Sequence, residues 1–368
     1  MSELFRTHKT LRMTTKEGLT QALEKRWERP QLMTIDDYRN LRESDRLDYN
    51  IARSAYTSGA IRLPTENGDQ GHKLLENLMR ANVHAPNRSG MMIDAEPHMG
   101  KTTLLRALME WTHQRYRADF PQAEYRGHVP IVYVEAQPDT SGKALATALL
   151  AFFGGTPYAR DNTPTIINRV IGLMRDAGTH LVCIDEFHNI AANNVGNGQT
   201  VDYIKSLHNE VEATFVISGI EVNKSKVLTD TPRGRQLRSR FTKHGIKPYR
   251  LGDATQQRQW QQLLLGFERE LPLLAQQRNS ILQFQTLLMK RTSGNIGALH
   301  KLLTRIAVDL IWADHPAREA LTADHIISMS LDIASEEAEL IADAEAEIEK
   351  ARAKKQAAKQ QRELAKVA

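Results

Sequence analysis

The residues from Asp94 to Thr103, DAEPHMGKTT, carry the spacing of a phosphate-binding loop. That pattern has a glycine, four further residues and then Gly-Lys-Ser/Thr, and Gly100, Lys101 and Thr102 match it. Backbone N–H groups of such a loop and the N-terminus of the next helix bind phosphate oxygens. Lys101 would contact the β- and γ-phosphates of ATP, and the Thr102 hydroxyl would bind Mg²⁺. The expected nucleotide-binding residues are Ala95, Glu96, Pro97, His98, Met99, Gly100, Lys101, Thr102 and Thr103.

Ala95 stands where the pattern has its first glycine. Alanine is tolerated there if its φ is negative, because glycine is needed chiefly where φ is positive. A Gly-Lys-Thr sequence also precedes ordinary helices by chance. Here the apolar run 90–94 predicts a strand before the loop, and residues 101–117 predict a helix after it. This is the context that the motif requires, so we expect a nucleotide site.

A pair of carboxylates follows a second apolar run, Leu181-Val182-Cys183-Ile184. Ligands of open α/β sheets bind at the carboxyl ends of the strands, which is where Asp185 and Glu186 would lie. Asp185 is then placed to hold the magnesium shell. Glu186 is placed to orient and deprotonate the attacking water. The alternative is a solvated acidic pair at a strand end, and the presence of both motifs in this order favours the catalytic interpretation.

Weaker candidates lie further along the chain. The run 214–218 predicts a strand that ends in a hydroxyl, and either Ser218 or Asn223 could contact the γ-phosphate or the water. Both could equally be polar loop residues. The arginine-rich run 233–241 could supply a cation to the nucleotide of a neighbouring subunit, or be a solvated helix end. His98 and His188 flank the site, and neither is assigned a catalytic role.

The elements that would position these residues alternate between strand and helix, which predicts an α/β fold with a parallel sheet covered on both faces. After residue 249 the pattern becomes helical throughout. Expected strands are 90–94, 129–134, 181–184 and 214–218; expected helices are 101–117, 143–153, 165–176, 201–210, 254–269, 280–291, 297–313 and 322–333. The expected domains are an N-terminal helical extension (1–66), a nucleotide-binding core (67–250), a helical lid (251–334) and a charged tail (335–368).

Composition sets limits on partners and location. Hydrophobic residues make up 41% of the chain, charged residues 25%, and the net charge is +5, which permits a nucleic-acid partner without requiring one. The single cysteine, Cys183, excludes an intrachain disulfide and is expected to be a core residue. No segment approaches about 18 consecutive apolar residues, so we expect a cytoplasmic protein without a membrane span.

The motifs taken together resemble the TniB/TnsC family of transposon AAA+ ATPases, which is related to the phage Mu target-selection ATPase. The resemblance covers residues 60–332. It rests on the degenerate P-loop, the stretch Ile-Asp-Glu-Phe-His-Asn at 184–189, the Leu-Arg-Ser-Arg-Phe box at 237–241, and Ser-Gly-Asn-Ile-Gly at 293–297.

This resemblance implies an AAA+ core that binds ATP and Mg²⁺ and oligomerises on double-stranded DNA, as a ring or a helical filament. It further implies target selection and recruitment of a DDE-type transposase. It supports the roles of Lys101, Thr102, Asp185 and Glu186, and favours Arg240 as the arginine finger. The second-sensor arginine of AAA+ lids is absent, since a glycine stands there, which with the missing P-loop glycine implies slow, switch-like hydrolysis.

The DNA contacts and the exact biological role leave alternatives open. Lys143, Lys224 and Lys226 are candidates for DNA contact near the core, although each could be a solvated surface lysine. The tail 335–368, acidic and then basic, could bind DNA, the transposase or neither. Other possible functions are a replication initiator or helicase loader, or a signalling ATPase that contacts only proteins. The short sequence after the lid argues against the winged-helix domain that initiators often carry.

Overall fold

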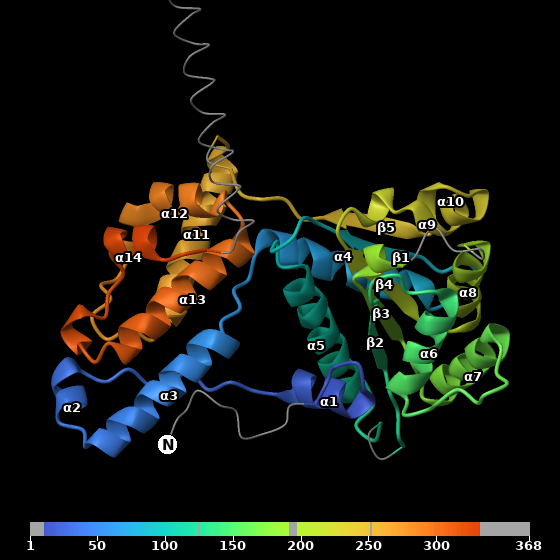
Figure 1. Cartoon of the computed structure of the whole chain (residues 1–368), viewed down its shortest axis with the longest axis horizontal. Helices are drawn as coiled ribbons and strands as arrows, with labels where there is room; N and C mark the ends of the chain where they lie inside the picture. Colours follow the sequence, from blue (N-terminus) through green and yellow to red (C-terminus); the bar gives the residue numbers. More distant parts are fainter. Residues whose placement is uncertain (1–10, 124–125, 191–196, 251, 332–368) are drawn as a thin grey trace, which may run out of the picture. The chain divides into compact units, whose positions relative to one another are not determined.

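The computed structural model describes residues 11–123, 126–190, 197–250 and 252–331. The chain divides into two compact units (Figure 1). The α/β unit comprises Met1–Arg26 and Thr65–Lys247, and the helical unit comprises Trp27–Pro64 and Pro248–Ala368. Residues 1–66, expected as one extension, are therefore shared between the units. The expected charged tail, 335–368, lies outside the described residues.

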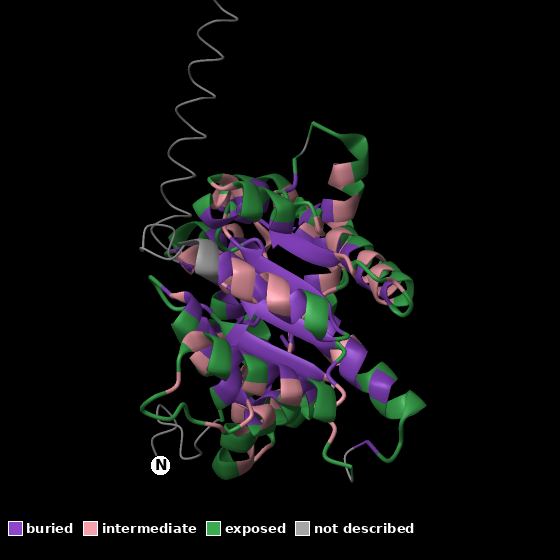
Figure 2. Cartoon of the chain, turned by 90° about the vertical axis from the view of Figure 1, so that its right-hand side faces the viewer, coloured by how far each residue is buried: buried purple, intermediate pink, exposed green. Residues whose placement is uncertain are grey.

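The α/β unit is built on a five-stranded parallel sheet with the order β2-β3-β4-β1-β5. The strands β1, β3 and β4 are buried along their whole length, and Figure 2 shows the buried sheet between helices with exposed outer sides. This is the predicted α/β class. The strands are β1 (Gly90–Asp94), β2 (Ile131–Glu135), β3 (Leu181–Asp185), β4 (Thr214–Gly219) and β5 (Phe241–Gly245).

Helices cover both faces of this sheet. Figure 1 shows α4 and α5 on one side and α6, α7 and α8 on the other. Polar caps start several of them; the Ser141 hydroxyl, for example, accepts from the Ala144 N–H at the start of α6. The longer helices are α1 (Lys16–Glu24), α4 (Glu66–Asn82), α5 (Lys101–Asp119), α6 (Gly142–Phe152), α7 (Thr163–Asp176) and α8 (Asn197–Glu210). The short ones are η1 (Phe187–Asn189), η2 (Val222–Lys224), α9 (Lys226–Thr229) and α10 (Pro232–Arg238).

Several of these elements were not among the expected ones, and β5 and α4 are the two that add most to the unit. Strand β5, FTKHG, lies at the sheet edge, and of its five residues only His244 is buried. An edge strand therefore lacks the continuous apolar run of a central strand. Helix α4 is capped by the Thr65 hydroxyl, which accepts from the Gly68 N–H at 3.0 Å. Its buried side, around Gly71 and Leu75, faces the core at helical spacing.

The helical unit has its own hydrophobic core, which includes Trp260, Phe267, Leu299 and Leu303. Its C-terminal part follows the expected helical pattern, except that 3-10 turns interrupt it. The last helix within the described residues ends at Ser328, whereas the expected one ran to residue 333. The elements are α2 (Ile35–Arg39), α3 (Glu43–Gly59), α11 (Ala254–Glu270), η3 (Ser280–Phe284), α12 (Gln285–Thr292), α13 (Ile296–Trp312), η4 (Pro316–Arg318) and α14 (Ala323–Ser328).

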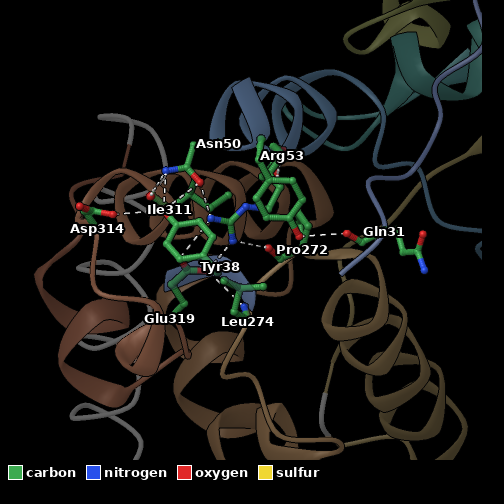
Figure 3. A network of polar contacts seen from close by, with 11 residues as sticks. Gln31, Tyr38, Asn50, Arg53, Pro272, Leu274, Ile311, Asp314 and Glu319 are labelled. Carbon is green, nitrogen blue, oxygen red and sulfur yellow. Dashed lines mark hydrogen bonds and ion pairs between the residues drawn. The ribbon is translucent and has the colours of Figure 1, made fainter. Parts of the chain in front are cut away.

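A buried ion pair joins the N-terminal part of the helical unit to its C-terminal part (Figure 3). Arg53 and Glu319 are both 0% exposed, and Arg53 donates through both Nη atoms to the two carboxylate oxygens. Arg53 also donates to the Pro272 carbonyl at 3.1 Å, and the Leu274 N–H donates to Glu319 at 3.1 Å. The polar atoms of this pair are thus largely satisfied inside the unit, and α3 is an integral part of it.

Among the described residues no helix is both long and apolar enough to cross a membrane.

Candidate functional site

The predicted phosphate loop follows β1 and leads directly into α5, as the motif requires. Lys101 is the first residue of α5 and is buried, and its Nζ donates to the carbonyls of Ala95 and Glu96, both at 2.9 Å. Burial lowers the pKa of Lys101, while the nearby carboxylates of Glu186 and Asp185 oppose that shift. The loop therefore folds around a lysine whose charge faces the acidic pair.

The backbone of the loop explains how an alanine can replace the first glycine. Ala95 does not have a positive φ, whereas His98 (φ 60°) and Gly100 (φ 82°) are left-handed. The position that requires glycine by its conformation is thus Gly100, where the chain turns into α5. Thr102 and Thr103 are exposed in the first turn of that helix.

The carboxylate of Asp185 is buried at the end of β3 and is held by uncharged donors. It accepts from the Ser218 hydroxyl, from the Glu186 N–H at 2.9 Å and from the Tyr133 hydroxyl at 3.3 Å. No ion pair to Asp185 is found in the described part of the chain. Its negative charge is therefore oriented by hydrogen bonds without a cation in direct contact, which suits a ligand for a metal ion.

Ser218 reaches the site, but with a different geometry from the one considered in the sequence. It is 0% exposed at the end of β4, which lies between β3 and β1, and its hydroxyl donates to Asp185. The Ser218 hydroxyl is therefore bonded to the Asp185 carboxylate in this structure.

Glu186 follows Asp185 in a left-handed conformation (φ 52°, ψ 37°), and its side chain is 31% exposed. A carboxylate at this point, next to Lys101, is accessible to a water molecule. Its Oε2 atom lies 3.4 Å from the Nε2 atom of His188. Glu135, at the end of β2, also lies at this edge, where burial and the two acidic neighbours raise its pKa.

Asp94, which was not a candidate in the sequence, connects the phosphate loop to the loop after β4. It accepts from the Val222 N–H at 2.9 Å and from Asn223 Nδ2 at 3.2 Å, and it forms an ion pair with Lys243 at 2.6 Å. Asn223 in turn accepts from Arg238 at 2.7 Å. The alternative residue Asn223 is therefore bound in a network. The sequence signal that could have indicated this contact is the position of Asp94, a carboxylate at the end of a predicted strand and immediately before the phosphate loop.

Arg240 lies at the amino ends of the strands, opposite to the carboxyl ends where the phosphate loop and the acidic pair lie. The Gly90 N–H donates to its carbonyl at 2.8 Å, which places it at the amino ends of β1 and β5. The phosphate loop begins beyond the other end of β1, about 20 Å away along the strand direction. The guanidinium donates to Asn209 on α8.

Burial, helped by the nearby arginines, lowers the pKa of His208 to about 4, so an uncharged ring lies beside Arg240 at neutral pH.

The three candidate DNA lysines lie in loops or helix starts that follow β2 and β4, at the same edge as the phosphate loop. Lys143 is exposed in the first turn of α6. Lys224 and Lys226 line an open cleft of about 430 Å³ between the loops that follow β2, β3 and β4. Lys224 is paired with Glu221, so part of its charge is already compensated.

A comparison with known protein families identifies the family of the chain. The family model described as "Bacterial TniB protein" matches residues 64–251, which is more than half of the chain. The chain belongs to the TniB family. The match spans the phosphate loop, the acidic pair and Arg240. Among curated protein sequences no relative of this TniB chain is found.

Solved structures place the TniB chain in the AAA+ P-loop fold. It is similar to the Aeropyrum pernix ORC1 protein in complex with DNA, with a TM-score of 0.55 and 16% identity over 75% of this chain and 68% of that chain. It is also similar to the Aeropyrum pernix ORC2 protein in ADPNP–ADP complexes, with a TM-score of 0.53 and 15% identity over 74% and 70%. At these identities the likeness concerns the fold.

Proposed function

We propose that this protein is an ATP-dependent regulator of DNA transposition that hydrolyses ATP. The observation that carries the ATPase part is the strand order, in which β4 lies between β3 and β1. It brings the ends of these strands together, so that Lys101, Ser218 and the pair Asp185–Glu186 face one site. A helix N-terminus, a buried lysine and an acidic pair are the parts that phosphoryl transfer needs.

The residues fit a magnesium nucleotide. Lys101 and the loop from Ala95 to Thr103 would bind the phosphates, and Thr102 with Asp185 would hold Mg²⁺, which neutralises the charge of the phosphates when bound. Ser218 keeps Asp185 in position. Glu186 takes a proton from the attacking water and orients it for in-line attack.

Arg240 acts on a neighbouring subunit in this proposal. Because it lies at the amino edge of the sheet, a strand length from its own phosphate loop, it serves a nucleotide held by another copy. An arginine supplied in trans makes hydrolysis depend on assembly. ATP would therefore promote a homo-oligomer, a ring or a filament, whose bound nucleotides lie between subunits.

Membership of the TniB family favours a role in transposition over the other AAA+ functions. In this role the oligomer binds double-stranded DNA through a few lysines per subunit, Lys143, Lys224 and Lys226 being candidates, and recruits the transposase to the target. In the helical unit Gly294 (φ 69°) packs against Tyr249, where an added Cβ would lie 2.1 Å from the carbonyl oxygen. A second-sensor arginine is thus excluded at that glycine, which supports slow, switch-like hydrolysis.

A DNA-binding titration tests this function. Wild type and Arg240→Ala are compared with ATP, with ADP and without nucleotide, at two salt concentrations. Wild type should bind duplex DNA cooperatively with ATP and lose affinity steeply as salt rises, because counterions are released for each phosphate neutralised. Arg240→Ala should bind ATP as a monomer but lose hydrolysis and cooperative DNA binding. Arg235→Ala is the matched control, because Arg235 lies on the same segment and its guanidinium donates to the Thr229 carbonyl.

Other results would separate the alternatives. Absence of DNA binding under every condition would favour the signalling ATPase that contacts only proteins. Tight binding that does not depend on nucleotide would assign DNA binding to an independent basic segment and contradict the switch.

A further inference from the structure

His188 connects the loops that follow β3 and β4. It lies in η1, two residues after Glu186, and its ring reaches across to the loop after β4. There the Ile220 N–H donates to Nδ1 at 3.2 Å. The other ring nitrogen, Nε2, lies 3.4 Å from Glu186 Oε2. One side chain therefore touches both the candidate base and the neighbouring strand end.

The contact with Ile220 determines which nitrogen carries hydrogen. Since Nδ1 accepts from a backbone N–H, the neutral ring must carry its hydrogen on Nε2. That hydrogen is on the nitrogen nearest to Glu186. The ring is thus oriented as a donor toward the carboxylate in its uncharged form.

The backbone is shaped around this ring. A Cβ atom added at Gly219 would lie 2.8 Å from His188 Nδ1 and 3.3 Å from the His188 backbone nitrogen. A side chain at position 219 would therefore displace the imidazole. Close packing and the hydrogen bond from Ile220 fix the ring independently of Glu186.

Glu186 needs such support. Its side chain is 31% exposed, and no second ion-pair partner of this carboxylate is found among the described residues. An exposed glutamate that is not held samples several rotamers, which costs entropy when it must point at one water. The 3.4 Å separation is longer than a normal hydrogen bond, but such contacts often tighten once substrate is bound.

We propose that His188 is a positioning residue that orients the carboxylate of Glu186 toward the attacking water. The inference rests on the proposed role of Glu186 as the base. His188 does not touch the phosphate loop in this scheme, so it acts on the rate of hydrolysis and not on ATP binding.

Two amide substitutions separate the two ring contacts. In His188→Gln the side-chain amide can replace Nε2 as a donor to Glu186 but offers no acceptor at Nδ1. In His188→Asn the amide oxygen can still accept from Ile220, but the side chain is too short to reach Glu186. We expect kcat to fall about 10-fold in His188→Ala and His188→Asn, as for loss of an outer-shell partner, with KM for ATP nearly unchanged. His188→Gln should keep most of the wild-type kcat.

A double mutant shows whether His188 acts through Glu186. In a Glu186→Gln background His188→Ala should lower the residual single-turnover rate no further, because residues that act as a unit are not additive. His84→Gln and His84→Asn, at an exposed position after α4, are the matched controls. Thermal unfolding of each variant identifies any loss of folded protein.

The outcomes separate this proposal from the function on which it rests. ATP hydrolysis by Glu186→Gln at the wild-type rate would show that Glu186 is not the base. If Glu186→Gln hydrolyses ATP slowly, three results would overturn the proposal for His188. The first is a kcat of His188→Ala equal to or above that of wild type, and the second is an equal further loss of rate when His188→Ala is added to Glu186→Gln. The third is a wild-type kcat in His188→Asn together with a reduced kcat in His188→Gln.

Discussion

Asp185 in the α/β unit and Glu319 in the helical unit are both almost fully buried carboxylates, yet their partners differ. Glu319 is paired with the guanidinium of Arg53, so its charge is neutralised inside the unit (Figure 3). Asp185 accepts hydrogen bonds from two hydroxyls and one backbone N–H. These donors are uncharged, so the negative charge of the carboxylate is not neutralised. Burying a carboxylate without a cation in contact costs free energy unless the carboxylate binds a cation. A buried ion pair whose charges cancel has a structural role instead.

The comparison shows that burial by itself does not mark a functional site. The distinguishing feature is a charge that the fold orients but does not compensate. The carboxyl ends of the strands have this property at Asp185 and Glu186, beside Lys101. The network around Arg53 does not, because the charges of its central pair cancel inside the helical unit.

The largest effect is expected at the lysine of the open site. Lys101→Met keeps the buried apolar stem and removes the charge that would contact the phosphates. ATP binding should fall below detection in a titration with fluorescent nucleotide, while the free energy of unfolding changes little. Lys73→Ala, an exposed lysine on α4, is the control. Equal ATP affinity in Lys101→Met and wild type would show that the nucleotide site lies elsewhere.

Removal of Glu319 should affect stability and not chemistry. Glu319→Ala leaves Arg53 as a buried charge without its partner, and the cost of breaking such a pair is about 3–5 kcal/mol of unfolding free energy. Urea unfolding measures it. Asp45→Ala, which breaks the exposed pair with Arg42 at the start of α3, should change stability little.

A second variant sharpens the same test. Replacing the pair by Arg53→Met with Glu319→Leu removes both charges and should recover most of the stability, since apolar groups of similar size can replace a buried ion pair. A double variant that is as unstable as Glu319→Ala would mean that the polar contacts of Arg53, and not the uncompensated charge, dominate.

The sequence predicted the parts of the fold that depend on local pattern. The central strands β1 and β3 are short apolar runs, and the helix after the phosphate loop begins at Lys101 as expected. Strand β5 was missed because an edge strand with exposed Thr242 and Lys243 has no continuous apolar signal. The order of the strands also could not be obtained, because it depends on contacts between residues far apart in the sequence.

The positions of the candidate residues in the fold were predictable from the motifs, and their contacts were not. Lys101 lies at the start of a helix and the acidic pair at a strand end, as the spacing of the motifs predicted. The contacts of Asp94 with Asn223 and of His188 with Ile220 join separate strand ends, and only the sheet order brings them together. The division of residues 1–66 between two units depends in the same way on the distant partners of Arg53.

The smallest effect is expected at Ser218, and it tests whether the charge of Asp185 needs its orientation. Ser218→Ala removes one of three donors to a buried carboxylate, and a hydrogen bond to a charged group contributes about 1.5–3 kcal/mol. If Ser218 orients Asp185, hydrolysis should require a higher Mg²⁺ concentration, while ATP binding without Mg²⁺ stays as in wild type. A Mg²⁺ titration of the hydrolysis rate measures this. Ser239→Ala is the control, because that hydroxyl bonds the Gln236 carbonyl within its own turn. A lower rate with an unchanged Mg²⁺ requirement would instead favour direct contact of Ser218 with phosphate or water, and would remove the contrast between the oriented charge of Asp185 and the neutralised pair of Arg53 and Glu319.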